Sequence, residues 1–198
     1  MGAEMDIETK TYIDGLNSER IPWNRMFTAY GTADHYSELL AVLEQTFDIE
    51  EWNKTFNQLS DFEHQSTMFP PAPFVLVFLV RILKRLLQES ADDIAEKLIG
   101  QFMYYTDVCN DAEAMEHAEP LSRFSDLLDD KYLLSEDDPE EDLQKVYGDP
   151  DAVPDELFFS FYYYSKIVLS GIPDILDQYG KFSAESKQLR NMFRQTKR

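Results

Sequence analysis

Residues 70–88 read PPAPFVLVFLVRILKRLLQ, and this stretch decides the fold class. Its prolines break the preceding chain and suit the first turn of a new helix, where the missing N–H costs nothing. From Phe74 to about Gln88 the sequence fits a helix, and its first half is apolar nearly all round. A helix that is apolar on every side belongs in the interior. We therefore expect a central buried helix here.

Helical spacing continues outward from this stretch in both directions. Apolar residues recur at intervals of three and four, glycine is scarce, and runs that alternate polar and apolar residues are almost absent. This pattern is typical of helices rather than sheets. The other expected helices span residues 22–30, 32–43, 48–59, 90–105, 156–170 and 184–195, with one more running through 115 to 128 and broken or kinked at Pro120. Residues 135–155 are rich in proline and predict a loop with room for one short helix.

Eight or nine helices joined by short links favour an all-α fold of consecutive antiparallel helix pairs. The 198 residues suffice for one domain, which would span residues 1–198. Self-similarity at a fixed period is poor, so the pattern leaves open an α-solenoid or an irregular helical bundle.

Two segments carry a resemblance to a known family. The first is Trp23-Asn24-Arg25-Met26 followed by Ala29-Tyr30-Gly31-Thr32-Ala33, and the second is His64-Gln65-Ser66-Thr67-Met68-Phe69 followed by Ala72-Pro73-Phe74. Together they resemble bacterial HEAT-repeat-like proteins, over about residues 21–88. Those proteins open with a Trp-containing helix ending in Ala-Tyr-Gly, and later carry a His-Gln-Gly-Thr-like turn before a proline-started helix. The chain departs from the pattern at Ser66, where the family favours glycine.

Beside an acidic insertion at about 130–156 and C-terminal helices at 157–196, which charge and helical spacing indicate, the resemblance implies a HEAT-like part over about residues 21–109. It also implies a scaffold without catalysis, and some family members resemble immunity proteins that neutralise partner toxins. In this interpretation, Ala29-Tyr30-Gly31 is a helix C-terminus with Gly31 in the left-handed conformation. His64 and Gln65 would lie at another helix end, where they can bond free carbonyl groups.

The net charge of −20, from 38 acidic and 18 basic residues, restricts the partners. A field of this sign repels phosphate backbones and anionic lipid, so we expect neither nucleic-acid nor membrane binding. The longest apolar run is seven residues, from Phe74 to Val80, whereas a membrane span needs about 20. Without a signal peptide at the N-terminus, the sequence predicts a cytoplasmic protein.

No arrangement of residues in the sequence predicts catalysis. Cys109 is the only cysteine, which excludes an intramolecular disulfide and a cysteine-based metal site, and we expect it to be a core residue. The three histidines, His35, His64 and His117, are spread along the chain, and none has a second histidine three or four residues away. Glu113 and His117 are four residues apart and could ligate a metal with help from another helix, although such a pair is commoner on a solvated helix. We therefore predict no enzyme, no cofactor and no metal.

The acidic charge is concentrated in one segment. Residues 110–156 hold 17 acidic and three basic residues, a net charge of −14, whereas residues 181–198 hold six basic residues and one acidic. One interpretation is a solvated loop neutralised by counterions or by the basic tail. The other is a landing site for a cationic partner, with divalent cation binding as a weaker third. Five apolar residues among the acids could anchor that partner or pin the loop to the core: Tyr132, Leu133, Leu134, Leu143 and Tyr147.

The leading functional hypothesis is non-enzymatic binding and inhibition of a basic protein, such as a nuclease toxin domain. An acidic inhibitor can occupy a cleft that is built for phosphate. The alternatives are a helical-repeat scaffold without a charge-driven ligand and, less favoured, a metal-binding enzyme. The predicted partner-binding residues are Glu136, Asp137, Asp138, Glu140, Glu141, Asp142, Asp149 and Asp151.

Overall fold

The computed structural model describes residues 5–195, which form an almost wholly helical fold, as predicted. The α-helices are α1 (Ile7–Gly15), α2 (Tyr36–Gln45), α3 (Ile49–Leu59), α4 (Ala72–Gln88), α5 (Asp92–Ala114), α6 (Pro139–Gly148), α7 (Asp155–Ser170), α8 (Ile172–Tyr179) and α9 (Ser183–Gln195). Short 3-10 helices are η1 (Ser18–Arg20), η2 (Trp23–Arg25), η3 (Ser60–Phe62), η4 (Phe124–Leu128), η5 (Asp130–Tyr132) and η6 (Pro150–Ala152). Two small antiparallel hairpins join β1 (Phe27–Thr28) to β2 (Gly31–Thr32) and β3 (Glu63–His64) to β4 (Thr67–Met68).

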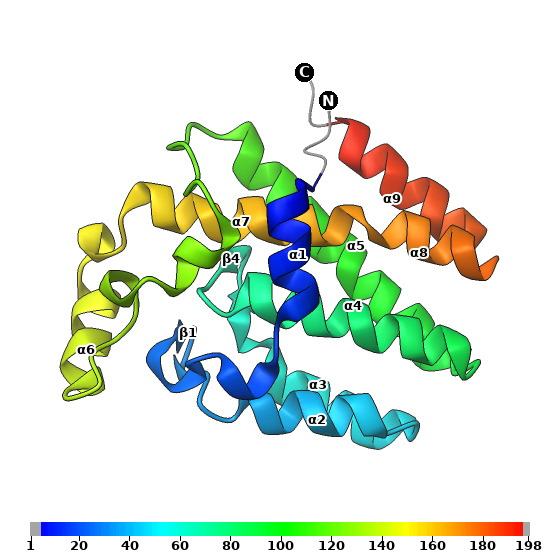
Figure 1. Ribbon diagram of the computed structural model, residues 1–198, viewed down its shortest axis with the longest axis horizontal. Helices are drawn as coiled ribbons and strands as arrows, with labels where there is room; N and C mark the ends of the chain where they lie inside the picture. The colour runs from blue at the N-terminus through cyan, green and yellow to red at the C-terminus, as the bar shows by residue number, and fades with distance from the viewer. Residues whose placement is uncertain (1–4, 196–198) are drawn as a thin grey trace.

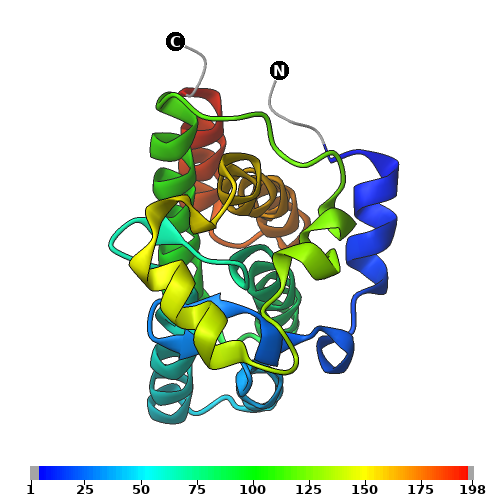
Figure 2. The same ribbon diagram turned by 90° about the vertical axis from the view of Figure 1, so that its left-hand side faces the viewer.

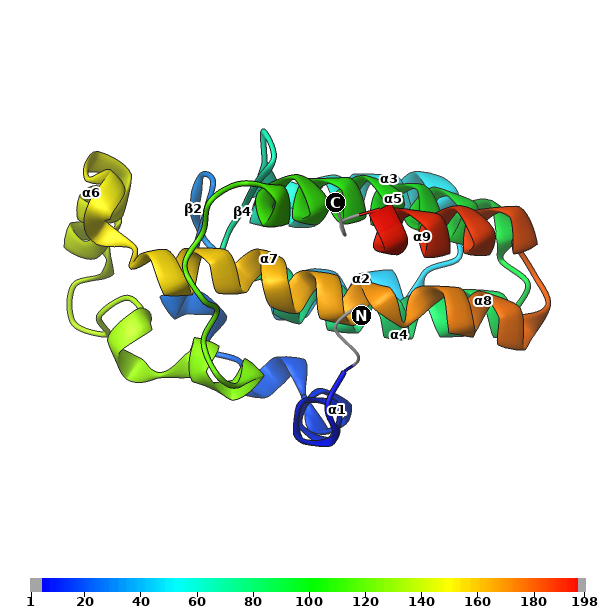
Figure 3. The ribbon, with the colours of Figure 1, turned by 90° about the horizontal axis from the view of Figure 1, so that it is seen from above.

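The longer helices stack as antiparallel pairs in two layers (Figures 1 and 3). One layer holds α2, α4 and the nearly continuous α7 and α8, and the other holds α3, α5 and α9. The pairs are therefore α2 with α3, α4 with α5, and α7–α8 with α9. Successive pairs contact one another within each layer, and α5 also packs on α7 across the layers. This arrangement confirms the predicted all-α fold of antiparallel pairs.

Helix α4 is the centre of the hydrophobic core. Every residue from Ala72 to Leu79 is buried, because α2, α5, α7 and α8 all pack against this helix. The side of the α4 layer that faces away from α5 carries α1 and η4, and the ring of Phe124 in η4 lies 5.1 Å from that of Phe74. Arg81 on α4 donates hydrogen bonds to the carbonyls of Ile13 (2.6 Å) and Leu16 (2.8 Å) at the end of α1. The buried helix predicted from residues 74–88 is confirmed.

The predicted helix over residues 22–30 is wrong. Only η2 is helical there, and the chain then forms the β1–β2 hairpin with Tyr30 in its turn. Gly31 has a φ of +146° inside the hairpin, so it does not end a helix. The hairpin forms because its groups find partners in η3: Ala29 N–H donates to the Asp61 carbonyl (3.0 Å) and the Thr28 hydroxyl to the Asp61 carboxylate (2.9 Å). Thr32, where the next helix was expected to begin, lies in β2, and α2 begins at Tyr36.

The helix predicted to run through Met115 to Leu128 is also wrong. Helix α5 continues to Ala114, after which the chain is irregular up to η4. Side chains of α7 form hydrogen bonds with backbone groups that would otherwise be paired within a helix. The amide of Leu121 donates to the Ser160 hydroxyl (2.7 Å), and its carbonyl accepts from the Tyr164 hydroxyl (2.6 Å).

His64 and Gln65 lie in the β3–β4 hairpin rather than at a helix end. Gln65 and Ser66 occupy the two-residue turn with φ angles of +51° and +65°. A turn with both central residues at positive φ favours glycine, because a Cβ is strained there. Ser90, where the next helix was expected to begin, also has a positive φ of +58°, and α5 begins at Asp92 without a side-chain cap.

Candidate docking surface

The eight predicted acidic residues lie on one projecting segment, residues 135–151, which we call the acidic arm. It consists of α6 with its flanks and forms one end of the molecule (Figures 1 and 2). Among the described residues of α6 none is buried. Much of the acidic sequence has a local role: Asp138 accepts a hydrogen bond from Glu141 N–H (3.1 Å), and the next acids occupy the first helical turn. Carboxylates stabilise that position because the helix dipole is positive there.

Seven of the eight carboxylates are exposed to solvent. The exception is Asp142, which is half-buried and accepts a hydrogen bond from Ser135 N–H (2.7 Å). Within the described part of the chain, Glu136 is the one member of the eight with an ion pair, at 3.4 Å from Arg25. The arm therefore keeps most of its negative charge unpaired with basic side chains of residues 5–195.

Two residues outside the predicted set hold the arm in place. The Arg25 side chain, 14% exposed, donates from Nε to the Leu134 carbonyl (2.6 Å) and pairs with Asp130 (2.8 Å). At the other end of α6, the Tyr147 hydroxyl donates to the Thr28 carbonyl (2.7 Å) and accepts from Gly31 N–H (3.0 Å). Partial burial raises the pKa of Tyr147, so this hydroxyl stays protonated well above neutral pH. The sequence offered no signal that linked Arg25 to a segment more than 100 residues away.

The apolar residues among the acids mostly pin the arm and its approach to the core. Leu134 is buried, Tyr132 and Leu133 pack partly against the core, and Leu143 is half-buried. Tyr147 remains half-exposed although its hydroxyl is bonded. Of the two roles considered for these residues, pinning describes Leu134 and Tyr147 in this structure.

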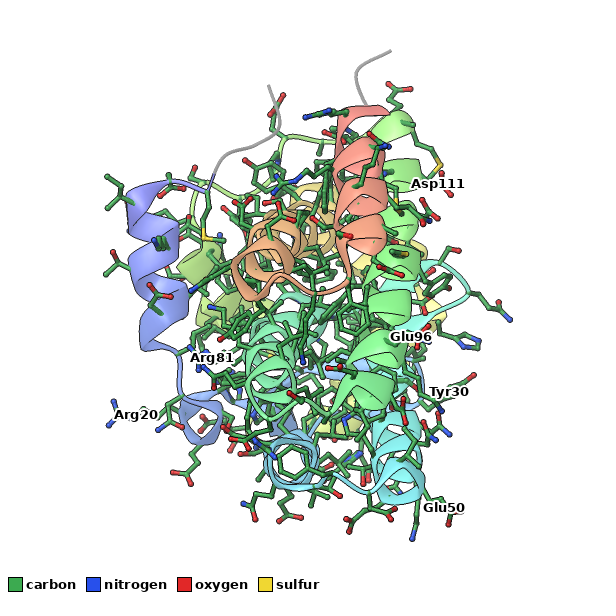
Figure 4. The ribbon with its side chains drawn as sticks, turned by 90° about the vertical axis from the view of Figure 1, so that its right-hand side faces the viewer. Arg20, Tyr30, Glu50, Arg81, Glu96 and Asp111 are labelled. Carbon is green, nitrogen blue, oxygen red and sulfur yellow. The ribbon has the colours of Figure 1, made fainter. Side chains whose placement is uncertain are left out.

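Exposed tyrosines continue from the arm across both hairpins. Tyr30, at the tip of the first hairpin, is 73% exposed, and its hydroxyl lies 3.1 Å from His64 Nε2 of the second; Figure 4 shows Tyr30 at the surface. Tyr104 of α5 donates to Glu63 of the second hairpin (2.8 Å). Tyrosine presents a large rigid apolar face with a polar tip, which is why it is common in protein interfaces.

The other groups considered for chemistry have structural roles. Glu113 on α5 pairs with Lys166 of α7, whereas His117 lies beyond the helix with its ring stacked on Phe159 at 3.5 Å. The two are therefore not neighbours on one helix face. Burial raises the pKa of the Cys109 thiol, which keeps it protonated and inert at neutral pH.

Among residues 5–195, no three histidine, cysteine, aspartate or glutamate side chains gather in a way that would hold a metal ion. Two further acidic residues pair with basic side chains, Asp92 with Lys181 (2.7 Å) and Asp130 with Arg25. The same part of the chain contains no helix with both the length and the apolar character of a membrane span.

The geometry defines an end of the molecule that combines exposed negative charge with exposed aromatic rings. Such a surface attracts cationic molecules over a distance and offers them apolar contacts on arrival. No protein-family model matches the chain, and no curated protein or solved structure matches it. This surface is therefore the feature of the molecule that points to a function.

Proposed function

We propose that the protein binds a basic protein partner through the acidic arm and works without catalysis. The observation that carries the proposal is the exposure of seven carboxylates on the arm, of which Glu136 alone pairs with a basic side chain of the described chain. Coulomb repulsion among such groups opposes folding, and a cationic partner would remove that cost. Opposite charge would also raise the rate of association.

The basic C-terminal segment does not supply the missing positive charge within the described residues. Lys181 pairs with Asp92 at the start of α5, and Arg190 pairs with Asp174 (2.8 Å) and Asp177 of α8. Helices α8 and α9 lie at the opposite end of the molecule from α6 (Figures 1 and 3). This separation favours an external partner over neutralisation by the tail.

The more specific proposal is an immunity protein that inhibits a basic toxin domain, such as a nuclease, in the bacterial cytoplasm. It is supported by the likeness of two sequence segments to HEAT-repeat-like proteins and by the stacked antiparallel pairs, which suit such a family. An acidic arm would occupy a phosphate-binding cleft and block it. A partner that carries phosphate itself would be repelled.

The test combines charge removal with a matched control. The double variant Glu140→Gln/Glu141→Gln removes two exposed charges from the arm, and Glu44→Gln/Glu50→Gln removes two exposed charges from α2 and α3 at the far end. Tagged proteins would be used to capture partners from source cells at about 50 and 300 mM salt, with identification by mass spectrometry. The immunity proposal further expects a neighbouring gene to encode a secreted protein with a basic C-terminal domain.

We expect the wild type and the control to retain a basic protein at low salt. The arm variant should retain at least ten-fold less of it. High salt should have the same effect as the arm variant because it screens exposed charges. An amount of captured protein that depends neither on salt nor on the arm substitutions would contradict charge-driven binding and favour a scaffold.

A further inference from the structure

A cavity of about 530 Å³ lies where the end of α5 meets the start of α7. Its walls combine residues of α5, of the irregular segment after it and of α7. The lining residues that matter here are Met115, Glu116, His117, Asp155, Phe158 and Tyr162. The cavity belongs to the same end of the molecule as the acidic arm, because α7 begins where the arm and η6 end (Figure 2).

The apolar wall is exposed, and its Phe158 ring packs on a buried tyrosine. Met115 is 66% exposed and Phe158 is 41% exposed. The Phe158 ring is held edge-on against Tyr162, with 5.4 Å between centroids, and Tyr162 is buried with its hydroxyl within 3.2 Å of Met68 N. Exposed apolar area on a fixed framework is the kind of surface that gains free energy when a partner covers it.

The rim carries negative charge only. Glu116 and Asp155 are both exposed, and no described lysine or arginine lines the cavity. His117 is stacked on Phe159, and its Nδ1 lies 2.9 Å from the Ala118 carbonyl. Lys166, the nearest base along α7, pairs with Glu113. A purely apolar occupant would desolvate two carboxylates without compensation.

We propose that this cavity receives an arginine side chain of the basic partner. The inference rests on the proposed function, because it supplies an anchor for the same partner. The aliphatic stem packs on Met115 and Phe158, and the guanidinium faces Glu116 and Asp155. Arginine fits better than lysine, because its planar, weakly hydrated group stacks on aromatic rings and forks onto carboxylates. Arginine is also among the commonest interface hot spots.

The test uses a small probe, N-acetyl-arginine methylamide, and its neutral isostere N-acetyl-citrulline methylamide. Methyl NMR of the full chain follows the methionine signals, and Met115→Leu identifies that of Met115. We expect the arginine probe to shift the Met115 signal with a dissociation constant on the order of millimolar, as suits a single side chain. Citrulline should bind at least five-fold more weakly.

Substitutions then assign the contacts. Glu116→Gln/Asp155→Asn and Phe158→Ala should each weaken arginine binding at least five-fold, whereas Glu44→Gln/Glu50→Gln should leave it unchanged. An unmoved Met115 signal, or equal responses to arginine and citrulline, would overturn the inference.

The arm variant separates this inference from the proposed function. Glu140→Gln/Glu141→Gln should bind the arginine probe as the wild type does, because neither residue lines the cavity. If that variant loses the partner while arginine leaves the Met115 signal unmoved in the wild type, the cavity proposal alone fails. If arginine binds the cavity but the arm variant keeps the partner at all salt concentrations, the proposed function alone fails.

Discussion

Ser66 shows how one residue can carry strain in an otherwise regular fold. Its φ of +65° lies in the left-handed region, where a side chain costs about 1–2 kcal/mol compared with glycine. The turn persists because both its strands are tied down: Tyr162 lies against Ser66 and Met68, and Ser66 N–H donates to Glu63 (2.8 Å). Ser66 therefore occupies a position whose backbone favours glycine.

The substitution Ser66→Gly should therefore stabilise the protein. We expect the free energy of unfolding to rise by about 1 kcal/mol and the melting temperature by about 2–4 °C, measured by thermal and urea denaturation. Ala41→Gly, at an exposed position in the middle of α2, is the control and should lower stability by about 1 kcal/mol. Equal losses in both variants would argue against strain at Ser66.

Tyr36 is the second residue with an individual role. Its ring is completely buried, and its hydroxyl donates a hydrogen bond to the Asp61 carboxylate, which also accepts from Thr28. This pairing links α2, η3 and the first hairpin. Burial, and then the bond to Asp61, raises the pKa of Tyr36 far above its ordinary value.

The raised pKa predicts a loss of stability at alkaline pH. The folded state holds the Tyr36 proton more tightly than the unfolded chain, whose tyrosines titrate near about pH 10. The stabilising contribution is thus complete below about pH 10 and is lost as pH rises beyond it. The free energy of unfolding in urea should fall between about pH 8 and 11. In Tyr36→Phe it should fall less steeply than in the wild type, by up to about 1.4 kcal/mol per pH unit. At neutral pH it should cost about 2 kcal/mol, since Asp61 loses a donor.

Tyr30→Phe, on an exposed ring, is the control for that cost and should change stability at neutral pH by no more than about 0.5 kcal/mol. A Tyr36→Phe protein as stable as the wild type at neutral pH would mean that the bond to Asp61 contributes nothing.

At the scale of elements, α6 differs from every other long helix in lacking a buried face among the described residues. It forms because of its cap, its proline start and the acids in its first turn, and it keeps its place through Arg25 and Tyr147. A helix held by a few polar contacts opens more readily than one packed in a core. We therefore expect the arm to open more readily than the helix layers.

Arg25→Ala should loosen the arm selectively. Loss of the bonds to Leu134 and Asp130 should speed hydrogen exchange of the amides in residues 140–148 about ten-fold or more, equivalent to about 1.4 kcal/mol. Amides of α4 provide the internal control and should keep their protection. The exchange rates in Arg25→Lys should lie between those of the wild type and Arg25→Ala, because lysine keeps the positive charge but lacks the several donors of the guanidinium group. Equal acceleration in α4 would instead indicate global destabilisation.

At the scale of the whole molecule, unpaired negative charge is concentrated on the acidic arm. The acidic arm lies at one end and α8 at the other (Figure 1), and Arg190 of α9 is paired with Asp174 and Asp177 of α8. A net charge of −20 makes repulsion a general cost of folding. The arm adds to that cost because so few of its carboxylates are neutralised.

Salt should therefore stabilise the isolated protein. Between about 10 and 300 mM NaCl the repulsion is screened, and the free energy of unfolding should rise by about 1 kcal/mol. Choline chloride should act like NaCl because screening does not depend on the cation. A decrease with salt would show that the ion pairs outweigh the repulsion. A much larger effect of calcium at equal ionic strength would indicate a bound cation instead.

The sequence by itself determined the helical class, the central position of residues 74–88 and the segregation of charge. Each depends on composition or on spacing within a few turns, which act wherever the segment lies. The eight carboxylates could be chosen as candidates for the same reason, since so dense a run of acids cannot be buried unpaired. Their function stays a prediction.

Only the tertiary structure decided the two hairpins, the end of α5 and the cavity beside it. Residues 22–30 and 115–128 have helical spacing, but Asp61, Ser160 and Tyr164 offer their backbone better hydrogen bonds from elsewhere in the chain. The same is true of Arg25, whose partner Leu134 is remote in sequence. Hydrogen bonds between distant residues follow from how layers stack, and local pattern does not encode that stacking.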